Sequence, residues 1–151
     1  MLMKTHLAIG AFAALFFLQQ VSHKSVFIVT ILIASLLPDI DSGFSTFGRK
    51  KIFKLIQMFT KHRGLFHSFT FCIVFSIFLA FYFPIFAFPF FLGYALHLFA
   101  DAWTIDGIRP FWPTKHVSKG KVRVGSPLED VIFVIFCILN ILALSFYIMQ
   151  F

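Results

Sequence analysis

The chain has 151 residues, of which 60% are hydrophobic and only 13% are charged. A soluble globular domain contains roughly 45–50% apolar and about 25% charged residues, so this composition excludes an ordinary soluble protein. The 25 phenylalanines are too many for the interior of so short a chain, whereas lipid can solvate them. Since the length suits one domain, we expect a single membrane-embedded domain over residues 1–151.

Five apolar segments follow one another along the chain, and each predicts an α-helix. They cover residues 7–18, 26–37, 69–83, 86–100 and 131–149. Pro38 ends the second segment, and Pro84 and Pro89 mark a break between the third and fourth, because proline disfavours a continuing helix. A spanning helix needs about 20 residues, so the short first two segments form either a spanning pair or a hairpin that enters the bilayer part way. The sequence thus predicts an all-α integral membrane bundle of about five apolar helices.

Charged residues are distributed unevenly between the two sides of this bundle. If the segments pair as hairpins, Lys24 is the only one of the 13 lysines and arginines on the far side. Short cytoplasmic loops carry an excess of Lys and Arg, so the charged side is predicted to be cytoplasmic. Residues 50–61 alternate lysines with apolar residues at helical spacing, which predicts an interfacial amphipathic helix or, alternatively, an ordinary basic loop.

Acidic residues and histidines gather on the same side. All six acids lie there, as do all the histidines except His23. After Pro38, an extended backbone would place Asp39 and Asp41 on one side of the chain. Ser68 is the expected N-cap of the third segment, directly after a motif that contains two histidines, at positions 62 and 67.

The fourth segment ends with His97 and Asp101, which share one helical face at i, i+4 spacing. That arrangement suits two ligands of one ion. Histidine and carboxylate without thiolate favour zinc, manganese or iron, and Cys72 and Cys137 lie in apolar runs without a ligand neighbour. The number of ligand-type residues exceeds the needs of one tetrahedral ion, so we expect one or two divalent ions, with zinc preferred.

The order of these motifs resembles that of a known family. The chain carries His6, then Leu-Pro-Asp-Ile-Asp, His-Arg-Gly-Leu-Phe-His-Ser, and Gly-Tyr-x-x-His-x-x-x-Asp ending at Asp101, followed by Trp112-Pro113. This is similar to the YdjM-like family of bacterial inner-membrane, metal-dependent hydrolases. Family members often have His-Pro after the Asp-x-Asp motif, where this chain has Ser42-Gly43. The resemblance implies these metal or catalytic residues: His6, Asp39, Asp41, His62, His67, His97, Asp101 and Glu129.

The resulting hypothesis is a metal-dependent hydrolase of phosphoesters at the cytoplasmic membrane surface, with a lipid phosphate as the favoured substrate. Bound ions would lower the pKa of a water molecule that attacks phosphorus. Asp41 or Glu129 would accept the proton, Arg63 would bind a phosphate oxygen, and Thr104 would orient the site. The partners expected are the bilayer and an anionic phosphate-containing substrate, with no nucleic acid.

Two other functions are compatible with the same residues. A metal or proton transporter would place its ionisable groups near the bilayer centre, and a non-catalytic membrane protein would use the charged side to dock a cytoplasmic partner. Because the ligand-type residues lie at the ends of the apolar segments, the sequence favours the enzyme over both.

Overall fold

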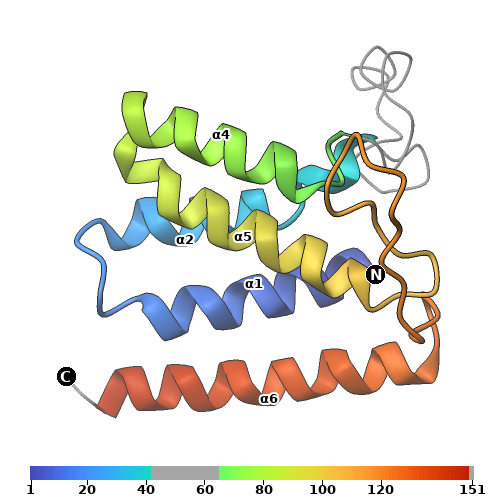
Figure 1. The fold of residues 1–151 in the computed structure, drawn as a ribbon. Coiled ribbons are helices and arrows are strands. Elements are labelled where there is room, and N and C mark those ends of the chain that lie inside the picture. Colours follow the sequence, from blue (N-terminus) through green and yellow to red (C-terminus); the bar gives the residue numbers. More distant parts are fainter. Residues whose placement is uncertain (42–64, 150–151) are drawn as a thin grey trace.

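The computed structural model describes residues 1–41 and 65–149, without the side chains of Ile40 and Asp41. Within these ranges the chain is all-helical, with five α-helices, a short 3₁₀-helix and no β-strand. The amphipathic helix expected over residues 50–61 lies outside the described residues. The elements in chain order are α1 (Met3–Phe17), α2 (Lys24–Ala34), η1 (Leu37–Asp41), α4 (Phe69–Tyr82), α5 (Pro84–Ala102) and α6 (Pro127–Met149) (Figure 1).

Each of the five apolar segments forms a helix, but two local expectations were wrong. Pro89 does not mark the break: α5 starts at Pro84 and includes Pro89, where a proline removes only one intrahelical hydrogen bond. The backbone after Pro38 is not extended but forms η1, and the N–H of Asp39 donates to the carbonyl of Leu36 at 3.2 Å. The side chain of Asp41 lies outside the described residues, so its position relative to Asp39 stays a prediction.

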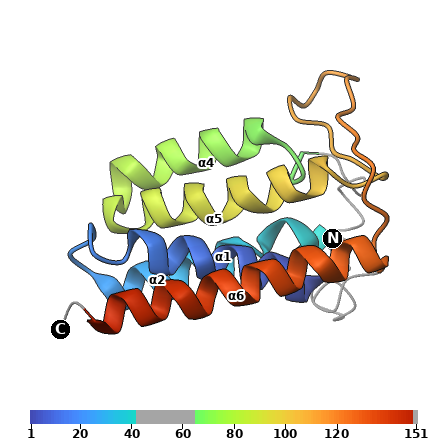
Figure 2. The same cartoon turned by 90° about the horizontal axis from the view of Figure 1, so that it is seen from below.

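Helix α5 lies at the centre of the packing, in contact with α1, α2 and α4, whereas α6 packs mainly along α1 (Figures 1 and 2). The close approach of α5 to α2 depends on Gly93. A Cβ atom at this position would lie only 2.4 Å from the carbonyl oxygen of Ile31. The absence of a side chain at Gly93 therefore sets the distance between the two helices that lead to the ligand-type residues.

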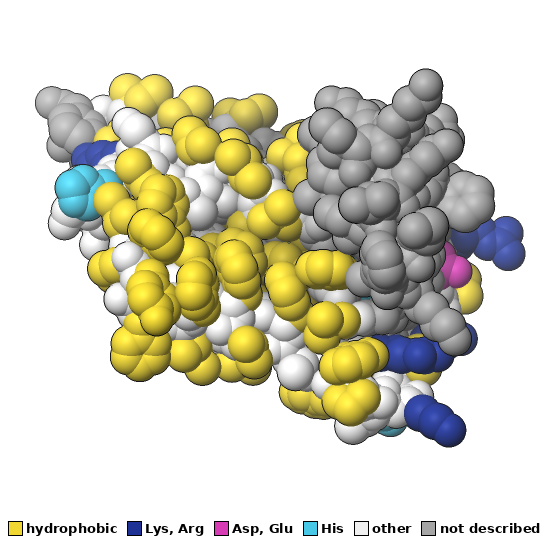
Figure 3. Space-filling view, turned by 90° about the horizontal axis from the view of Figure 1, so that it is seen from above, with side chains coloured by type: hydrophobic (Ala, Val, Ile, Leu, Met, Phe, Trp, Pro, Cys, Tyr) yellow, Lys and Arg dark blue, Asp and Glu magenta, His cyan; other side chains and the backbone are white. Residues whose placement is uncertain are grey.

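Two of the described helices are long and apolar enough to cross a bilayer. These are α5 and α6, while α1 and α4 are shorter apolar helices. At 1.5 Å per residue, the 23 residues of α6 extend about 35 Å, compared with about 30 Å for the hydrocarbon core of a bilayer. Hydrophobic side chains cover the helical face seen in Figure 3, as expected of a protein surrounded by lipid.

The charged side chains lie at the two ends of the helices, and mostly at one of them. Among the described residues, Lys24, the first residue of α2, is the only lysine or arginine at the end where α1 leads into α2. Its Nζ atom lies 3.2 Å from the hydroxyl oxygen of Tyr147, near the end of α6. At the opposite end, Lys4 pairs with Asp130 at 2.6 Å. The uneven distribution expected from the sequence is thus present in the fold.

Candidate metal centre

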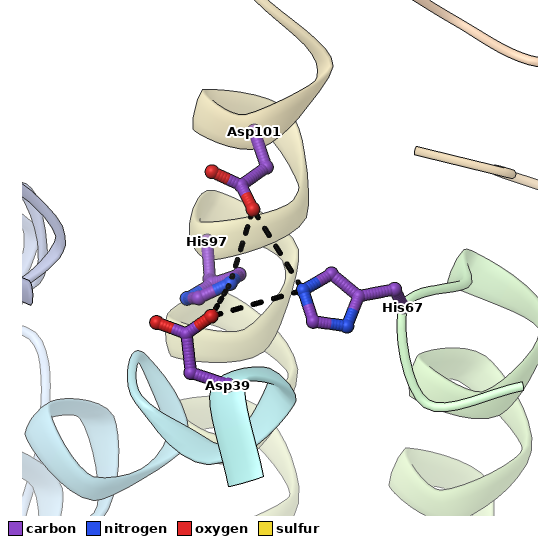
Figure 4. Close-up of side chains that lie close together, drawn as sticks. All are labelled: Asp39, His67, His97 and Asp101. Atoms are coloured by element: carbon purple, nitrogen blue, oxygen red, sulfur yellow. Dashed lines mark ion pairs between the residues drawn. The ribbon is translucent and has the colours of Figure 1, made fainter. Parts of the chain in front are cut away.

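Four ligand-type side chains converge at the charged end of the bundle. Asp39 comes from η1, His67 from the turn before α4, and His97 and Asp101 from the last turns of α5 (Figure 4). One ligand atom from each of the four lies within 4.8 Å of the others. The two aspartates and two histidines, which are far apart in the sequence, therefore form a group that can hold a metal ion.

Each histidine faces both carboxylates in this group. The Nε2 atom of His67 lies 3.7 Å from Asp101 Oδ2 and 3.9 Å from Asp39 Oδ1, and His97 Nε2 lies 3.7 Å and 3.8 Å from the same two oxygens. Ligands about 2.0–2.2 Å from a tetrahedral zinc ion are separated from one another by roughly 3.3–3.6 Å. These four distances exceed that range by only a few tenths of an ångström, whereas the widest separation in the group, up to 4.8 Å, would have to close by about 1 Å around such an ion.

The orientation of His97 is fixed by the end of α2. Its Nδ1 atom lies 2.7 Å from the carbonyl oxygen of Ser35, which can only accept a hydrogen bond, so Nδ1 carries the proton and Nε2 keeps its lone pair. Nε2 is buried and has no hydrogen-bond partner within the described part of the chain. A backbone carbonyl that sets the tautomer is the usual support of a metal-bound histidine, so this atom is ready to bind a cation.

His6 lies directly beside the four-residue group without being part of it. Its ring stacks on that of His97, with centroids 3.8 Å apart and planes 12° apart. Its Nε2 atom is 3.3 Å from Asp101 Oδ1, an oxygen that the amino group of Met1 also contacts. Asp101 therefore directs one oxygen toward the group of four and the other toward His6.

Asp39 is the least buried of the four ligand-type residues. About 19% of its side chain is exposed, compared with 4% or less for each of the other three. Burial raises the pKa of the Asp39 carboxyl, and the negative charge of Asp101 acts in the same direction, while His6 opposes it. Two carboxylates held this close together favour a cation between them.

The segments that carry these side chains are held by further polar contacts. Thr104, which the sequence predicts to orient the site, donates a hydrogen bond from Oγ1 to the carbonyl of Asp101 at 2.7 Å and accepts one from Gly107 N at 3.2 Å. The hydroxyl of Tyr94 donates to the carbonyl of Phe66 at 2.5 Å, next to His67. These three hydrogen bonds fix the end of α5 and the turn before α4.

The predicted N-cap of α4 is confirmed. Ser68 accepts a hydrogen bond from the N–H of Phe71 at 3.2 Å. The N–H of Phe69 also donates to the carbonyl of Pro110 at 2.8 Å. The start of α4 is therefore held by its own N-cap and by the segment at Pro110. Both contacts restrict the position of the turn that carries His67.

Glu129 lies outside the four-residue group, at the start of α6. It is fully buried, and its Oε1 atom accepts hydrogen bonds from Leu2 N at 2.5 Å and Thr5 Oγ1 at 3.1 Å. Its Oε2 atom accepts one from Gly125 N at 2.6 Å. These contacts join the beginning of α1 to the beginning of α6, and both carboxylate oxygens are used in them.

Three further predicted site residues lie outside the described residues. They are His62 and Arg63, together with the side chain of Asp41. Sequence reasoning also missed two supporting groups, the carbonyl of Ser35 and the hydroxyl of Tyr94. A backbone carbonyl leaves no signal in the sequence, whereas Tyr94 stands three residues before His97, on the same helical face, and was found only as part of a motif.

Comparison with known proteins gives one result. A sequence model of the family described as YdjM inner membrane protein matches residues 1–150, which confirms the family indicated by the order of the motifs. No curated protein and no solved structure matches the chain.

Proposed function

Because the chain belongs to the YdjM family of inner membrane proteins, we propose that it is a multi-pass, metal-dependent hydrolase with its active site on the cytoplasmic side of the membrane. The proposed substrate is a phosphoester, preferably a lipid phosphate. The observation that carries the proposal is the group formed by Asp39, His67, His97 and Asp101 at one end of the helices. The proposed orientation rests on the excess of Lys and Arg at the same end.

The position of this group supports an enzyme over a transporter. His97 and Asp101 occupy the last turns of α5, Asp39 follows α2, and His67 precedes α4. A transporter site would be expected near the bilayer midplane, whereas these residues meet where the helices end. A site at the helix ends would lie beside the phosphates of lipid headgroups and within reach of a soluble phosphoester.

The four side chains have the donor chemistry of a site for a borderline divalent ion. Two imidazoles and two carboxylates without a thiolate suit zinc, with manganese or iron as alternatives. His6 and the Oδ1 atom of Asp101 offer a position for a second ion beside the first. A bound divalent ion supplies the acidity that makes water a nucleophile near neutral pH, and it neutralises phosphate charge.

The remaining groups would handle the proton and the substrate. In the proposed reaction, the oxygen of water forms a bond to phosphorus and the ester P–O bond breaks, and the leaving oxygen takes a proton from solvent to depart as an alcohol. Asp41 is our proposed acceptor of the water proton, and Arg63 would bind a phosphate oxygen through two parallel hydrogen bonds. Glu129 was the other predicted base and a predicted ligand; its three hydrogen bonds favour a positioning role.

The experiment that tests this function combines metal analysis with a substrate screen. Protein purified without chelator is expected to contain one or two divalent ions per chain, and the loaded protein is expected to release inorganic phosphate or an alcohol from phospholipids or phosphomonoesters. Less than half an equivalent of any transition metal, with no gain on reconstitution, would contradict the metal site. Full loading without turnover of any phosphoester would contradict the hydrolase.

A further inference from the structure

An apolar groove lies beside the candidate metal centre, between α1, α5 and α6. Its volume is about 380 Å³, and its lining is entirely apolar, with Ala13 from α1, Leu96 and Trp103 from α5, and Ile132 from α6 among the lining residues. Small-molecule sites have volumes of about 300–1,000 Å³. The groove is thus large enough for one flexible chain and too small for a whole two-chain lipid.

On α5, the groove and the metal centre occupy neighbouring stripes of the same helix. Leu92, Leu96 and Trp103 line the groove, and the spacing of i, i+4 and i+11 places them on one face. His97 follows Leu96 by one position, and Asp101 follows Ala100, which also lines the groove, by one position. One position is a rotation of about 100° around the helix axis. The end of the groove at Trp103 is therefore adjacent to the ligand-type side chains of His97 and Asp101.

Helix α1 shows the same continuity. His6 stands three residues before Ile9 and seven before Ala13, so all three share a helical face, and Ile9 and Ala13 line the groove. Met1 lines the groove as well, while its amino group contacts Asp101. The groove therefore begins at the polar site and continues away from it along the apolar parts of the helices.

We propose that this groove binds one hydrocarbon chain of the substrate while the phosphoester at the head of that chain lies at the metal centre. This inference rests on the proposed hydrolase function and narrows its substrate to phosphoesters that carry a long alkyl, acyl or isoprenoid chain. The occupant must be apolar, because the lining offers no partner for a polar group, and burying an unpaired polar group costs free energy.

The surroundings and length of the groove agree with a lipid chain. Both candidate membrane spans, α5 and α6, contribute to its walls, so the groove faces the hydrocarbon of the bilayer. Along α5 it extends from Leu92 to Trp103, which is about 16 Å at 1.5 Å per residue. This is about half of the ~30 Å hydrocarbon core, the depth that one leaflet's chain occupies.

The test uses a pair of matched variants on α6. Ile132 lines the groove, whereas Val134 is 53% exposed and does not line it. Ile132→Trp narrows the groove, Val134→Trp adds the same bulk outside it, and Phe136→Ala enlarges it. The metal-loaded proteins are assayed in detergent with alkyl phosphates of increasing chain length and with p-nitrophenyl phosphate, which has no chain.

Binding is measured separately from turnover. Trp103 lines the groove, and Trp112 is the only other tryptophan of the chain. In a Trp112→Phe background, an alkyl phosphonate with a brominated chain is expected to quench Trp103 fluorescence, and the unbrominated compound is expected to reverse the quenching. A phosphonate is not hydrolysed, so this readout does not depend on activity.

In the unmodified protein, kcat/KM is expected to rise by up to about fourfold for each methylene that the groove removes from water and then to level off. With Ile132→Trp it should level off at a shorter chain, and with Phe136→Ala at a longer one. Val134→Trp should match the unmodified protein for every substrate, including p-nitrophenyl phosphate.

The outcomes separate this inference from the proposed function. Equal chain-length profiles for Ile132→Trp and Val134→Trp, with no shift in Phe136→Ala, would overturn the groove assignment and leave the hydrolase intact. Competitive quenching of Trp103 in the Trp112→Phe protein, without turnover of any ester, would support the groove and overturn the hydrolase.

Discussion

The two ends of the helical bundle differ in whether they bury histidine side chains. At the end where α1 leads into α2, His23 is exposed, next to Lys24. At the other end His116 is also exposed, but His6, His67 and His97 are each only 1% exposed. His97 Nε2 faces Asp39 and Asp101 rather than a hydrogen-bond donor or solvent. Since burying polar groups without partners costs free energy, the contrast indicates that the second end is built to bind a ligand.

The first prediction tests on which side of the membrane the charged end of the bundle lies. In a background without Cys72 and Cys137, a cysteine at Ser118 should be labelled only from the cytoplasmic side of the bilayer, because most of the Lys and Arg lie at that end. A cysteine at Ser22 should be labelled only from the opposite side. Membrane-impermeant maleimide, applied to intact cells and to inverted vesicles, measures both.

Each labelling result has a distinct consequence. Labelling of the Ser118 position from outside intact cells would reverse the proposed orientation. Labelling of the Ser22 position from the cytoplasmic side would instead show that α1 and α2 form a hairpin that enters the bilayer without crossing it.

The second prediction compares the removal of ligand-type residues of the metal centre with the removal of exposed histidines. His97→Ala and Asp101→Asn should each lower bound metal at least tenfold and abolish turnover, because both side chains belong to one group of ligand atoms. The double variant should be little worse than either single variant, since residues that act as a unit are not additive. Metal content per folded chain measures the effect.

The matched controls are His23→Ala and His116→Ala, which change exposed histidines and should leave both metal content and turnover unchanged. Intact expression and unchanged helix content are required for the comparison. Full metal occupancy in folded Asp101→Asn would contradict the assignment of α5 as a ligand helix and would reopen the transporter and docking hypotheses.

The helices and part of the candidate metal centre could be predicted from the sequence because they follow from local patterns. The apolar segments gave the helices within a few residues, since the length and composition of a buried or lipid-facing helix are local properties. The i, i+4 spacing placed His97 and Asp101 together, and Ser68 identified the start of α4. These features depend on neighbours in the chain, which the sequence displays directly.

The features that the sequence did not predict depend on contacts between distant segments. The carbonyl of Ser35 orients His97 from 62 positions away, and no residue type encodes a backbone carbonyl. The backbone at Asp39 was expected to be extended because Pro38 disfavours helix in the residue before it, but proline's own φ also suits the start of a 3₁₀ turn. The hydrogen bonds by which Glu129 joins α1 to α6 were not predicted either, while its role as a ligand or base stays a prediction.

The third prediction changes the metal centre without touching a ligand. Gly93→Ala would place a Cβ atom 2.4 Å from the carbonyl oxygen of Ile31, so α2 and α5 must separate. Overpacking of this kind costs about 1–3 kcal/mol. Because η1 follows α2, the separation also moves Asp39 away from His97, and we expect metal affinity to fall roughly tenfold, as for other supporting residues of metal sites.

Gly10→Ala is the graded control for this effect. Its Cβ atom would lie 3.0 Å from the Oγ atom of Ser35, a side-chain atom that can move, so the loss of metal affinity should be smaller. Metal titration in detergent with a competing chelator compares the two variants. Equal affinity in Gly93→Ala and the unmodified protein would show that the α2–α5 distance does not control the site.

The last prediction concerns Glu129, which has the smallest expected effect on the metal centre. Glu129→Gln keeps the shape of the side chain but replaces one acceptor oxygen with an amide, and it removes the charge that strengthens the hydrogen bonds from Leu2, Thr5 and Gly125. Hydrogen bonds to a charged group contribute about 1.5–3 kcal/mol each, and glutamine retains part of this contribution. We therefore expect a loss of about 1–3 kcal/mol in the free energy of unfolding, with bound metal unchanged.

Thermal unfolding and metal analysis of the same Glu129→Gln sample distinguish a positioning role from a ligand or base. Lower stability with full metal content would place Glu129 among the residues that join α1 to α6 near the site. A loss of metal at unchanged stability would instead make it a ligand, as the family resemblance implies. Unchanged stability and metal content with lost turnover would leave only its role as the base, because the amide cannot accept the proton of the attacking water.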